Sequence, residues 1–370
     1  MHGVPGGLIA GGLFLAPSVL VLLALSSVYV TWGELPWLVG VFAVLKPAVL
    51  AIVLVAAWRL GRRILHTPLL IGLAIAAFLA LALLRIPYPL VVIGAAVVGL
   101  VAGQVRPSVV VPRQSTALTG SSAAAEGLAI APALHDDATP TPEHARWSRR
   151  RLLITLLVWA IALLLPLAAL VMVAGWNGPL AVMARFFTRV ALLSFGGAYA
   201  VLPYVAQGAV EQFGWLSADQ MLDGLALGET TPGPLIMVVA FVGFMGGWST
   251  SAGSWPMAVA ATLVTVWFTF LPSFGFILAG APLVEASRGD LRLGAPLTAI
   301  TAAVVGVIAS LAVFFAGPVL WPSGAFHPAA ALVVALALWA QLRLGWSVLQ
   351  VIGCAAAVGI AMALLTSLLG

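Results

Sequence analysis

The sequence predicts an all-α, polytopic membrane protein with about eleven transmembrane helices in two inverted-repeat halves. Of the 370 residues, 63% are hydrophobic and only 7% are charged. The apolar residues form runs of roughly 20, the length that crosses a bilayer as a helix, and Gly and Pro break two of these runs. A soluble domain carries about 25% charged residues, so hydrocarbon must be the main solvent of this chain.

Four apolar runs are expected to form the first membrane half, over residues 1–105. They cover residues 8–31, 37–57, 68–84 and 88–104. The first run lacks a basic leader and a cleavage site, and it is longer than the core of a signal peptide. We therefore predict that it is a membrane span.

The segment 106–150 interrupts the apolar pattern because it is rich in Pro, Ser, Thr, Ala and charge. Such a composition buries little apolar surface and stays flexible, which predicts a cytoplasmic linker. An apolar run at 152–175 follows, and we expect a linking transmembrane helix over residues 151–178.

The second membrane half is expected over residues 179–370. Its six apolar runs cover residues 180–207, 225–250, 256–281, 293–317, 326–342 and 345–369. The first two contain Gly-Gly and Pro-Gly-Pro, which break helices, and the pattern leaves open whether they span the bilayer or re-enter it.

Basic residues and a weak internal repeat predict the orientation. Cytoplasmic loops are enriched in Arg and Lys, so the loop with Arg59, Arg62 and Arg63 is predicted to be cytoplasmic, which places the N-terminus inside. Alternation of the spans then places Arg288, Arg292 and Arg343 inside too. The exceptions to the rule are Arg85, Arg185 and Arg189. A shift of 255 positions sets Pro17-Ser18 on Pro272-Ser273. The matched spans run in opposite directions, as in the inverted repeats of secondary transporters.

Several function classes are excluded. The net charge of +5 comes from basic residues at the ends of apolar runs, so we expect a lipid partner and no nucleic acid. The single Cys354 excludes an intramolecular disulfide, and the five histidines form no metal-ligand pair, so no metal or cofactor is expected. No nucleophile with a base lies within the spans, which argues against an enzyme. The oligomeric state, a homodimer among the options, is left open.

The two helix breaks are the candidate functional site. A broken helix leaves N–H and C=O groups without partners, which a membrane tolerates only inside protein or a water-filled cavity. The N-terminus of a half-helix carries a partial positive charge and free N–H groups, and it therefore suits an anion. Close packing at Gly-Gly and a simple kink at Pro-Gly-Pro are the structural alternatives.

The candidate substrate-binding residues at the breaks are Ser194, Phe195, Gly196, Gly197, Tyr199, Thr230, Thr231, Pro232, Gly233 and Pro234. Arg189 and the single lysine, Lys46, are candidate countercharges, although Lys46 could instead pair with a carboxylate such as Glu229 or snorkel to the interface. Glu229 is a candidate for ion coupling. We expect Glu211, Asp219 and Asp223 to lie in a solvated loop.

The sequence resembles the chromate ion transporter family. The resemblance rests on "SFGGAYAVLPYV", on "FGWLSADQMLDGLALGETTPGPLIMVVAFVGFMGG", and on "GLFLAPS" followed by "GVFAVLKPAVLAIV", which stand in the family order. It implies a multi-pass protein of the plasma membrane, the inner membrane of a bacterium, that exports chromate and confers chromate resistance, with sulfate as the structural mimic.

The resemblance also implies a long form with two halves of opposite orientation. A full-length relative would carry a second copy of both motifs in its first half, and here that copy is absent, so we expect the N-terminal part of the first half to be missing. An oxyanion channel and an inactive, truncated transporter are the alternatives.

Overall fold

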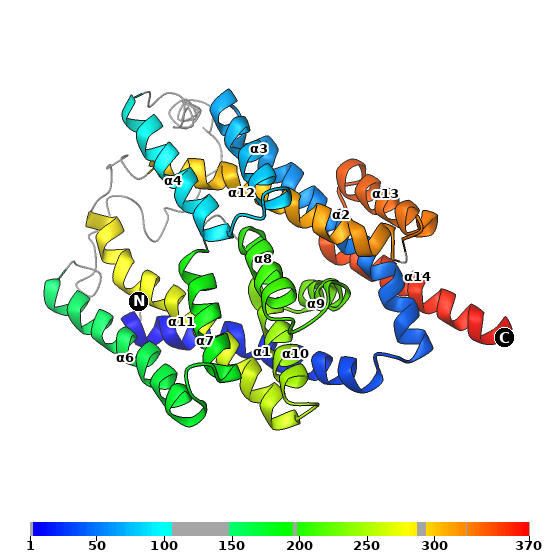
Figure 1. The fold of residues 1–370 in the computed structure, drawn as a ribbon, viewed down its shortest axis with the longest axis horizontal. Coiled ribbons are helices and arrows are strands. Elements are labelled where there is room, and N and C mark those ends of the chain that lie inside the picture. The colour runs from blue at the N-terminus through cyan, green and yellow to red at the C-terminus, as the bar shows by residue number, and fades with distance from the viewer. Residues whose placement is uncertain (1–2, 106–147, 195–197, 287–293, 323, 370) are drawn as a thin grey trace, which may run out of the picture.

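The computed structural model describes residues 3–105, 148–194, 198–286, 294–322 and 324–369, and every regular element in these ranges is a helix (Figure 1). The prediction of an all-α protein is confirmed. Most of the predicted linker (106–147) lies outside the described residues, as do Arg288 and Arg292.

The first half contains the four predicted helices. They are α1 (Gly3–Trp32), α2 (Pro36–Ile64), α3 (Pro68–Ala82) and α4 (Tyr88–Val105). A proline stands at the first turn of α2 and of α3, where its missing N–H costs nothing. The Thr67 side chain caps α3 by accepting a hydrogen bond from the Leu70 amide at 3.4 Å.

The linking helix and the last four helices of the second half are unbroken. They are α6 (Arg149–Ala174), α11 (Trp255–Ala286), α12 (Gly294–Leu320), α13 (Pro328–Arg343) and α14 (Val348–Leu369). Within the described residues, seven helices are long and apolar enough to cross a membrane: α1, α2, α4, α6, α11, α12 and α14. The helices α3 and α13 are apolar but shorter.

The run 180–207 is a helical hairpin and not one span. It contains α7 (Pro179–Leu192), α8 (Ala198–Ala206) and a π-helical turn, η4 (Gln207–Gln212). The ring of Phe186 on α7 lies 5.4 Å from the ring of Tyr204 on α8 and 5.6 Å from that of Trp215 beyond η4. The second arm therefore runs back along the first, and we call α7, α8 and η4 hairpin 1.

The run 225–250 turns back in the same way. It begins earlier than predicted, with α9 (Ala218–Thr230), and continues through the 3-10 turn η5 (Leu235–Met237) into α10 (Val238–Thr250). Gly228 on α9 faces Val238, Gly224 faces Phe241, and the Ser249 hydroxyl donates to the Trp215 carbonyl oxygen at 3.0 Å. These pairings identify α9, η5 and α10 as a second hairpin, hairpin 2. The expectation of eleven spans is therefore corrected, because two apolar runs are hairpins.

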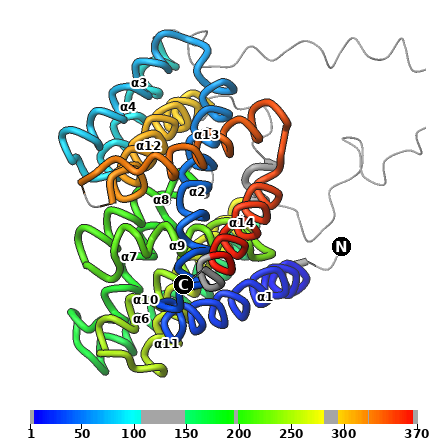
Figure 2. The backbone as a smooth tube through the Cα atoms, turned by 90° about the vertical axis from the view of Figure 1, so that its right-hand side faces the viewer, coloured from blue at the N-terminus to red at the C-terminus, as the bar shows by residue number. Residues whose placement is uncertain are grey.

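The remaining helices pack the two halves of the chain against each other. The shift of 255 positions relates α2 to α12, α3 to α13 and α4 to α14. In the structure α12 packs against α3 and α4, while α2 packs against α13 and α14, and α2 and α12 contact each other. Figure 2 shows α3, α4, α12 and α13 in the upper part of the molecule and α6, α7, α10, α11 and α1 in the lower part, with α2 between them.

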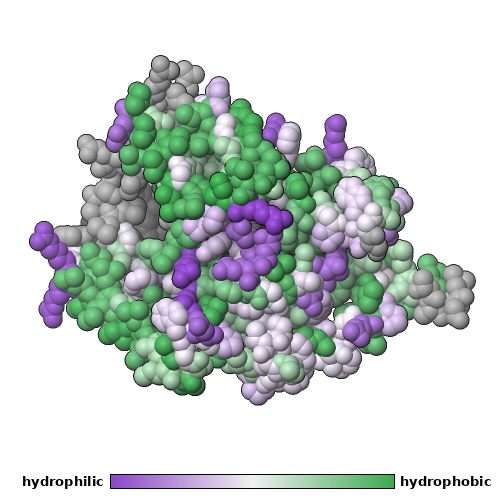
Figure 3. All heavy atoms as spheres, viewed as in Figure 1, coloured by the Kyte–Doolittle hydropathy of each residue, from purple (hydrophilic) through white to green (hydrophobic). Residues whose placement is uncertain are grey.

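Apolar surface covers much of the outside, as a bilayer requires. Helix α6 has no buried residue and is held to α11 by two indole hydrogen bonds: Trp159 donates to the Leu271 carbonyl oxygen and Trp267 to that of Ala162, both at 3.1 Å. In Figure 3 hydrophobic atoms cover broad areas of one face, and hydrophilic atoms gather near its middle, over hairpin 1. The chain is a polytopic membrane protein.

Gly306 tests the repeat packing, since it brings α12 against the backbone of α3. A Cβ at Gly306 would overlap the Ala74 carbonyl oxygen, whereas one at Gly317 on the same helix would meet nothing within 4 Å. We expect Gly306→Ala to lower the free energy of unfolding of the detergent-purified protein by about 1–3 kcal/mol, as overpacking does, and so to lower its melting midpoint. Gly317→Ala should leave the midpoint unchanged or raise it slightly. Fluorescence-detected size exclusion after heating measures both. Equal midpoints for the two variants would contradict the close packing of α3 on α12.

Candidate functional site

The two hairpins meet at their turns. Tyr199, at the start of α8, donates a hydrogen bond from its hydroxyl to Glu229 Oε1 near the end of α9, at 2.6 Å. Helix α8 also packs against η5, which follows the Pro-Gly-Pro turn. Tyr199 and residues 229–234, thirty-odd positions apart in sequence, therefore lie close together.

The break in hairpin 2 carries polar groups that are open to the outside of the protein. Thr230, Pro232 and Gly233 are exposed, whereas Thr231 is buried. The Thr230 and Thr231 hydroxyls donate to the carbonyl oxygens of Leu227 and Gly228, both at 2.8 Å. These bonds satisfy carbonyls that the end of α9 leaves free, and the hydroxyl oxygens keep their lone pairs.

The break in hairpin 1 is described on both of its sides. Ser194 is exposed, and Tyr199 is half-buried; Phe195, Gly196 and Gly197 lie outside the described residues. Tyr88 of α4 donates to the Leu193 carbonyl oxygen at 3.4 Å and stacks on Tyr204 of α8, with ring centroids 5.3 Å apart. The first half of the chain thus contacts the end of α7 and the helix α8 through Tyr88.

Helix α1 runs beside hairpin 2 and touches it at two places. The Ser18 hydroxyl donates to the Pro232 carbonyl oxygen in the break, and Tyr29, three turns further along, donates to Asp223 Oδ2 at 2.8 Å. Sequence reasoning missed both residues. The available signal was polarity, since Ser18 and Tyr29 are among the few polar side chains of an apolar helix.

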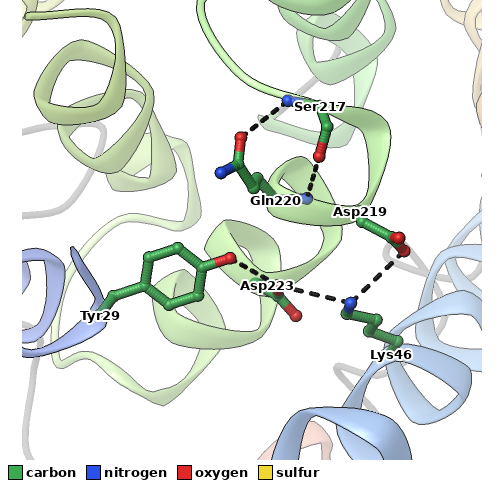
Figure 4. A network of polar contacts seen from close by, with 6 residues as sticks. All are labelled: Tyr29, Lys46, Ser217, Asp219, Gln220 and Asp223. Carbon is green, nitrogen blue, oxygen red and sulfur yellow. Dashed lines mark hydrogen bonds and ion pairs between the residues drawn. The ribbon is translucent and has the colours of Figure 1, made fainter. Parts of the chain in front are cut away.

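Lys46 does not pair with Glu229, which corrects one of the predicted pairings. Its Nζ lies 3.4 Å from Asp219 Oδ1 and 3.5 Å from Asp223 Oδ2 (Figure 4). Ser217 and Gln220 form a capping box, which fixes the start of α9 and so places both aspartates opposite α2.

The expectation of a solvated loop around Asp219 and Asp223 is wrong. Both residues lie on α9, where a spacing of four puts them on one face. Asp223 is only 4% exposed, whereas the Asp219 side chain is 52% exposed. The short hydrophilic stretch before the Pro-Gly-Pro motif forms a helix because its capping box and its neighbours α2 and α10 support it. Glu211, which was also expected in a solvated loop, is exposed and lies in the last turn of η4.

Arg189 lies exposed on the last turn of α7, the turn next to the break. Arg185, one turn earlier, stacks on Trp176 at 4.1 Å and donates to its carbonyl oxygen at 2.7 Å. Arg185 is thus turned toward the start of α7, whereas Arg189 is the arginine of hairpin 1 that lies next to the break.

A cavity of about 170 Å³ opens beside hairpin 1, between α3, η4 and α12. Its polar lining residues are Arg85, Gln207, Glu211 and Ser310. Arg85 and Glu211 therefore lie close together. If residues 180–207 formed a complete span, the predicted topology would place these two residues on opposite sides of the membrane. Among the described residues, no three His, Cys, Asp or Glu side chains lie together as a metal site.

Comparison with known proteins identifies the family. A family model described as "Chromate transporter" matches residues 1–100 and 181–360. The chain belongs to the chromate transporter family. The family match covers α1 to α3, most of α4 and nearly all of both hairpins, and it leaves out residues 101–180, which include the predicted linker and α6.

Three curated relatives agree with the family match. The chain is 32% identical to a chromate transport protein of Pseudomonas aeruginosa over 82% of its own length and 62% of the relative's. It is 26% identical to a probable chromate transport protein of Synechococcus elongatus over 84% of its length, and 26% identical to a chromate transport protein of Cupriavidus metallidurans over 85%; each match covers 66% of the relative. The chain thus spans just under two thirds of the length of these relatives. No solved structure matches it.

Proposed function

We propose that this chain is a secondary transporter that exports chromate, or a sulfate-like oxyanion, across the plasma membrane. The family and the names of the three relatives support chromate as the substrate. The observation that carries the proposal is the meeting of two interrupted helices at one place, joined by Tyr199 and Glu229. Paired discontinuous helices mark the substrate site of many secondary transporters.

The proposed cradle lies between the two turns. Ser194, Phe195, Gly196, Gly197 and Tyr199 contribute from hairpin 1, and residues 230–234 contribute from hairpin 2. Hydroxyl groups and the N–H groups of half-helix ends donate to the oxyanion. Arg189 supplies the countercharge, and the cavity lined by Arg85 and Gln207 is the proposed approach.

Lys46 and Glu229 take indirect roles in this proposal. Two carboxylates already neutralise Lys46, so its effect on the substrate comes through α9 and not through contact. Glu229 accepts a hydrogen bond from Tyr199 and so joins the two turns. Exchange of a proton at Glu229 changes the strength of this hydrogen bond and in this way couples proton binding to transport.

Export needs no coupling ion on energetic grounds. One charge moving through 100 mV is worth about 2.3 kcal/mol, so a dianion leaving a negative interior gains about 4.6 kcal/mol. At about 1.4 kcal/mol per tenfold ratio, this sustains roughly three decades of concentration. An oxyanion channel is the second candidate, because polar helix breaks also line selectivity filters.

Uptake of radiolabelled chromate into inverted vesicles tests the proposal. We expect saturable uptake that excess sulfate inhibits and that substitution of Gly197 or Thr231 removes. Uptake that ignores sulfate and both substitutions would remove the proposed site. Flux that does not saturate would favour the channel.

The tie between the hairpins gives a sharper prediction. Tyr199→Phe removes only the hydroxyl that donates to Glu229 and leaves a half-buried acceptor without this partner, a loss of about 1–3 kcal/mol. We expect chromate uptake to fall about tenfold or more. Tyr204→Phe is the matched control, because its ring stacks on Tyr88 and keeps that contact without the hydroxyl. Equal loss in both variants would contradict a role for the Tyr199–Glu229 bond.

A further inference from the structure

Four polar side chains from three helices form a closed group away from the two turns (Figure 4). Tyr29 comes from α1, Lys46 from α2, and Asp219 and Asp223 from α9. In Figure 4 the Lys46 ammonium reaches toward both aspartates, and the Tyr29 hydroxyl points at Asp223. The group joins the arm of hairpin 2 to the first half of the chain.

The group carries one negative charge too many when both aspartates are ionised. Two carboxylates face a single ammonium, and no further charge comes from the packed neighbours: in their described residues α1, α10, α12, α14 and η5 contain no Asp, Glu, Lys, Arg or His. Cys354 of α14 is exposed. Arg59, the nearest further charge on α2, is 13 residues beyond Lys46, about 20 Å along a helix. Glu229, at the other end of α9, adds a further negative charge.

One oxygen of the group has no partner. Asp223 Oδ2 accepts from Tyr29 and lies beside Lys46, but Asp223 Oδ1 is buried and accepts no hydrogen bond from the described residues. The residue is 96% buried, since its exposed fraction is 4%. A buried, ionised oxygen without a donor is costly, and a bound cation or proton would remove that cost.

We propose that the Lys46–Asp219–Asp223 group is a proton-binding site, with Asp223 Oδ1 as the atom that takes up the proton. An O–H bond forms at Oδ1, the charge of the group changes from −1 to 0, and no electron is transferred. Water supplies and removes the proton by way of Asp219, whose side chain is half exposed. The Lys46 ammonium, within 3.5 Å of both carboxylates, already occupies the place that a metal cation would need.

The link to transport rests on the proposed function. Asp223 is six residues from Glu229 on one helix, about 9 Å along its axis. Removing a negative charge at this distance favours an anion at the break of hairpin 2, because the surroundings are poor in water. The protonated group therefore binds the oxyanion more tightly, and the KM for chromate follows pH.

Infrared difference spectroscopy of the purified, lipid-reconstituted chain tests the proton site without chromate. Between alkaline and acidic pH we expect the carbonyl band of a protonated carboxyl group. The component of this band that comes from Asp223 should be lost in Asp223→Asn, persist in Glu229→Gln, and shift in position in the conservative Asp223→Glu variant. A band that is absent from the parent chain, or that is unchanged in Asp223→Asn or Asp223→Glu, overturns the proposal.

Chromate kinetics in vesicles test the link. We expect the KM to rise at least about tenfold from acidic to alkaline pH in the parent chain, as a charge at this distance from a dianion implies, and to lose this dependence in Asp223→Asn. A carboxyl band without any chromate uptake would refute the proposed function and leave the proton site standing. Uptake whose KM keeps its pH dependence in Asp223→Asn overturns the link.

Discussion

Gly233→Ala is expected to abolish most chromate transport while the protein still inserts in the membrane. Gly233 lies in the break of hairpin 2 with φ 149°, in the region that favours glycine. Side chains held in sparsely populated backbone regions cost about 1–3 kcal/mol. A Cβ at this position would also overlap the Ser18 side chain, whose hydroxyl holds the neighbouring Pro232 carbonyl. Both effects displace the turn, so we expect at least about a tenfold loss.

Two further variants separate the backbone effect from the overlap. Gly345→Ala is the matched control, because Gly345 also has a positive φ of 71° but a Cβ there meets nothing within 4 Å. Ser18→Gly combined with Gly233→Ala removes the overlap and should transport more than Gly233→Ala alone. Vesicle uptake, normalised to folded protein, measures all three. Parent-like uptake by Gly233→Ala would mean that the turn does not bind the substrate.

The helices could be predicted from the sequence because apolar length alone determines them. Every predicted run contains helix in the structure, and the boundaries of α2, α4 and α12 lie within a few residues of the prediction except at the longer end of α2. A run of roughly 20 apolar residues has few alternatives to a helix in lipid, since its backbone groups must bond to one another.

The hairpins could not be predicted in this way. A Gly or Pro break suits a kinked span as well as a turn. Replacing two spans by two hairpins changes the number of membrane crossings by two, so the basic residues of the other loops stay on the same side and do not distinguish the alternatives. Only contacts across the break decide, such as Phe186 with Tyr204 or Gly224 with Phe241. These pairs are 17 or 18 residues apart, and in an apolar segment aromatic residues and glycines give no sequence signal for pairing.

The partners of Lys46 were missed for a related reason. Asp219 and Asp223 stand in a hydrophilic stretch, which by composition alone indicates a loop. The capping box at Ser217 and Gln220 and the spacing of four between the aspartates indicate a helix with a charged face. Burial of that face comes from α2, a helix about 180 residues earlier in the chain, and local sequence carries no information about such a distant neighbour.

Lys46→Gln is expected to destabilise the protein more than any other change of one charge. The ammonium is close to two carboxylates, one of them 96% buried. Breaking a buried ion pair by removing one partner costs about 3–5 kcal/mol, because the other charge is left uncompensated. We expect a clearly lower melting midpoint and a lower yield of monodisperse protein in detergent.

The charge balance makes this prediction specific. The parent group carries −1, Lys46→Gln carries −2, and Lys46→Gln with Asp223→Asn returns to −1. The double variant should therefore recover much of the lost stability, and Lys46→Arg should lose little, because the positive charge remains. Arg63→Gln, at the exposed C-terminal end of α2, is the control for the loss of a basic residue. Two results would contradict this prediction: a melting midpoint of Lys46→Gln equal to that of the parent, or a further loss of stability when Asp223→Asn is added to Lys46→Gln. Either result would mean that the contacts of Lys46 with Asp219 and Asp223 do not hold hairpin 2 to α2.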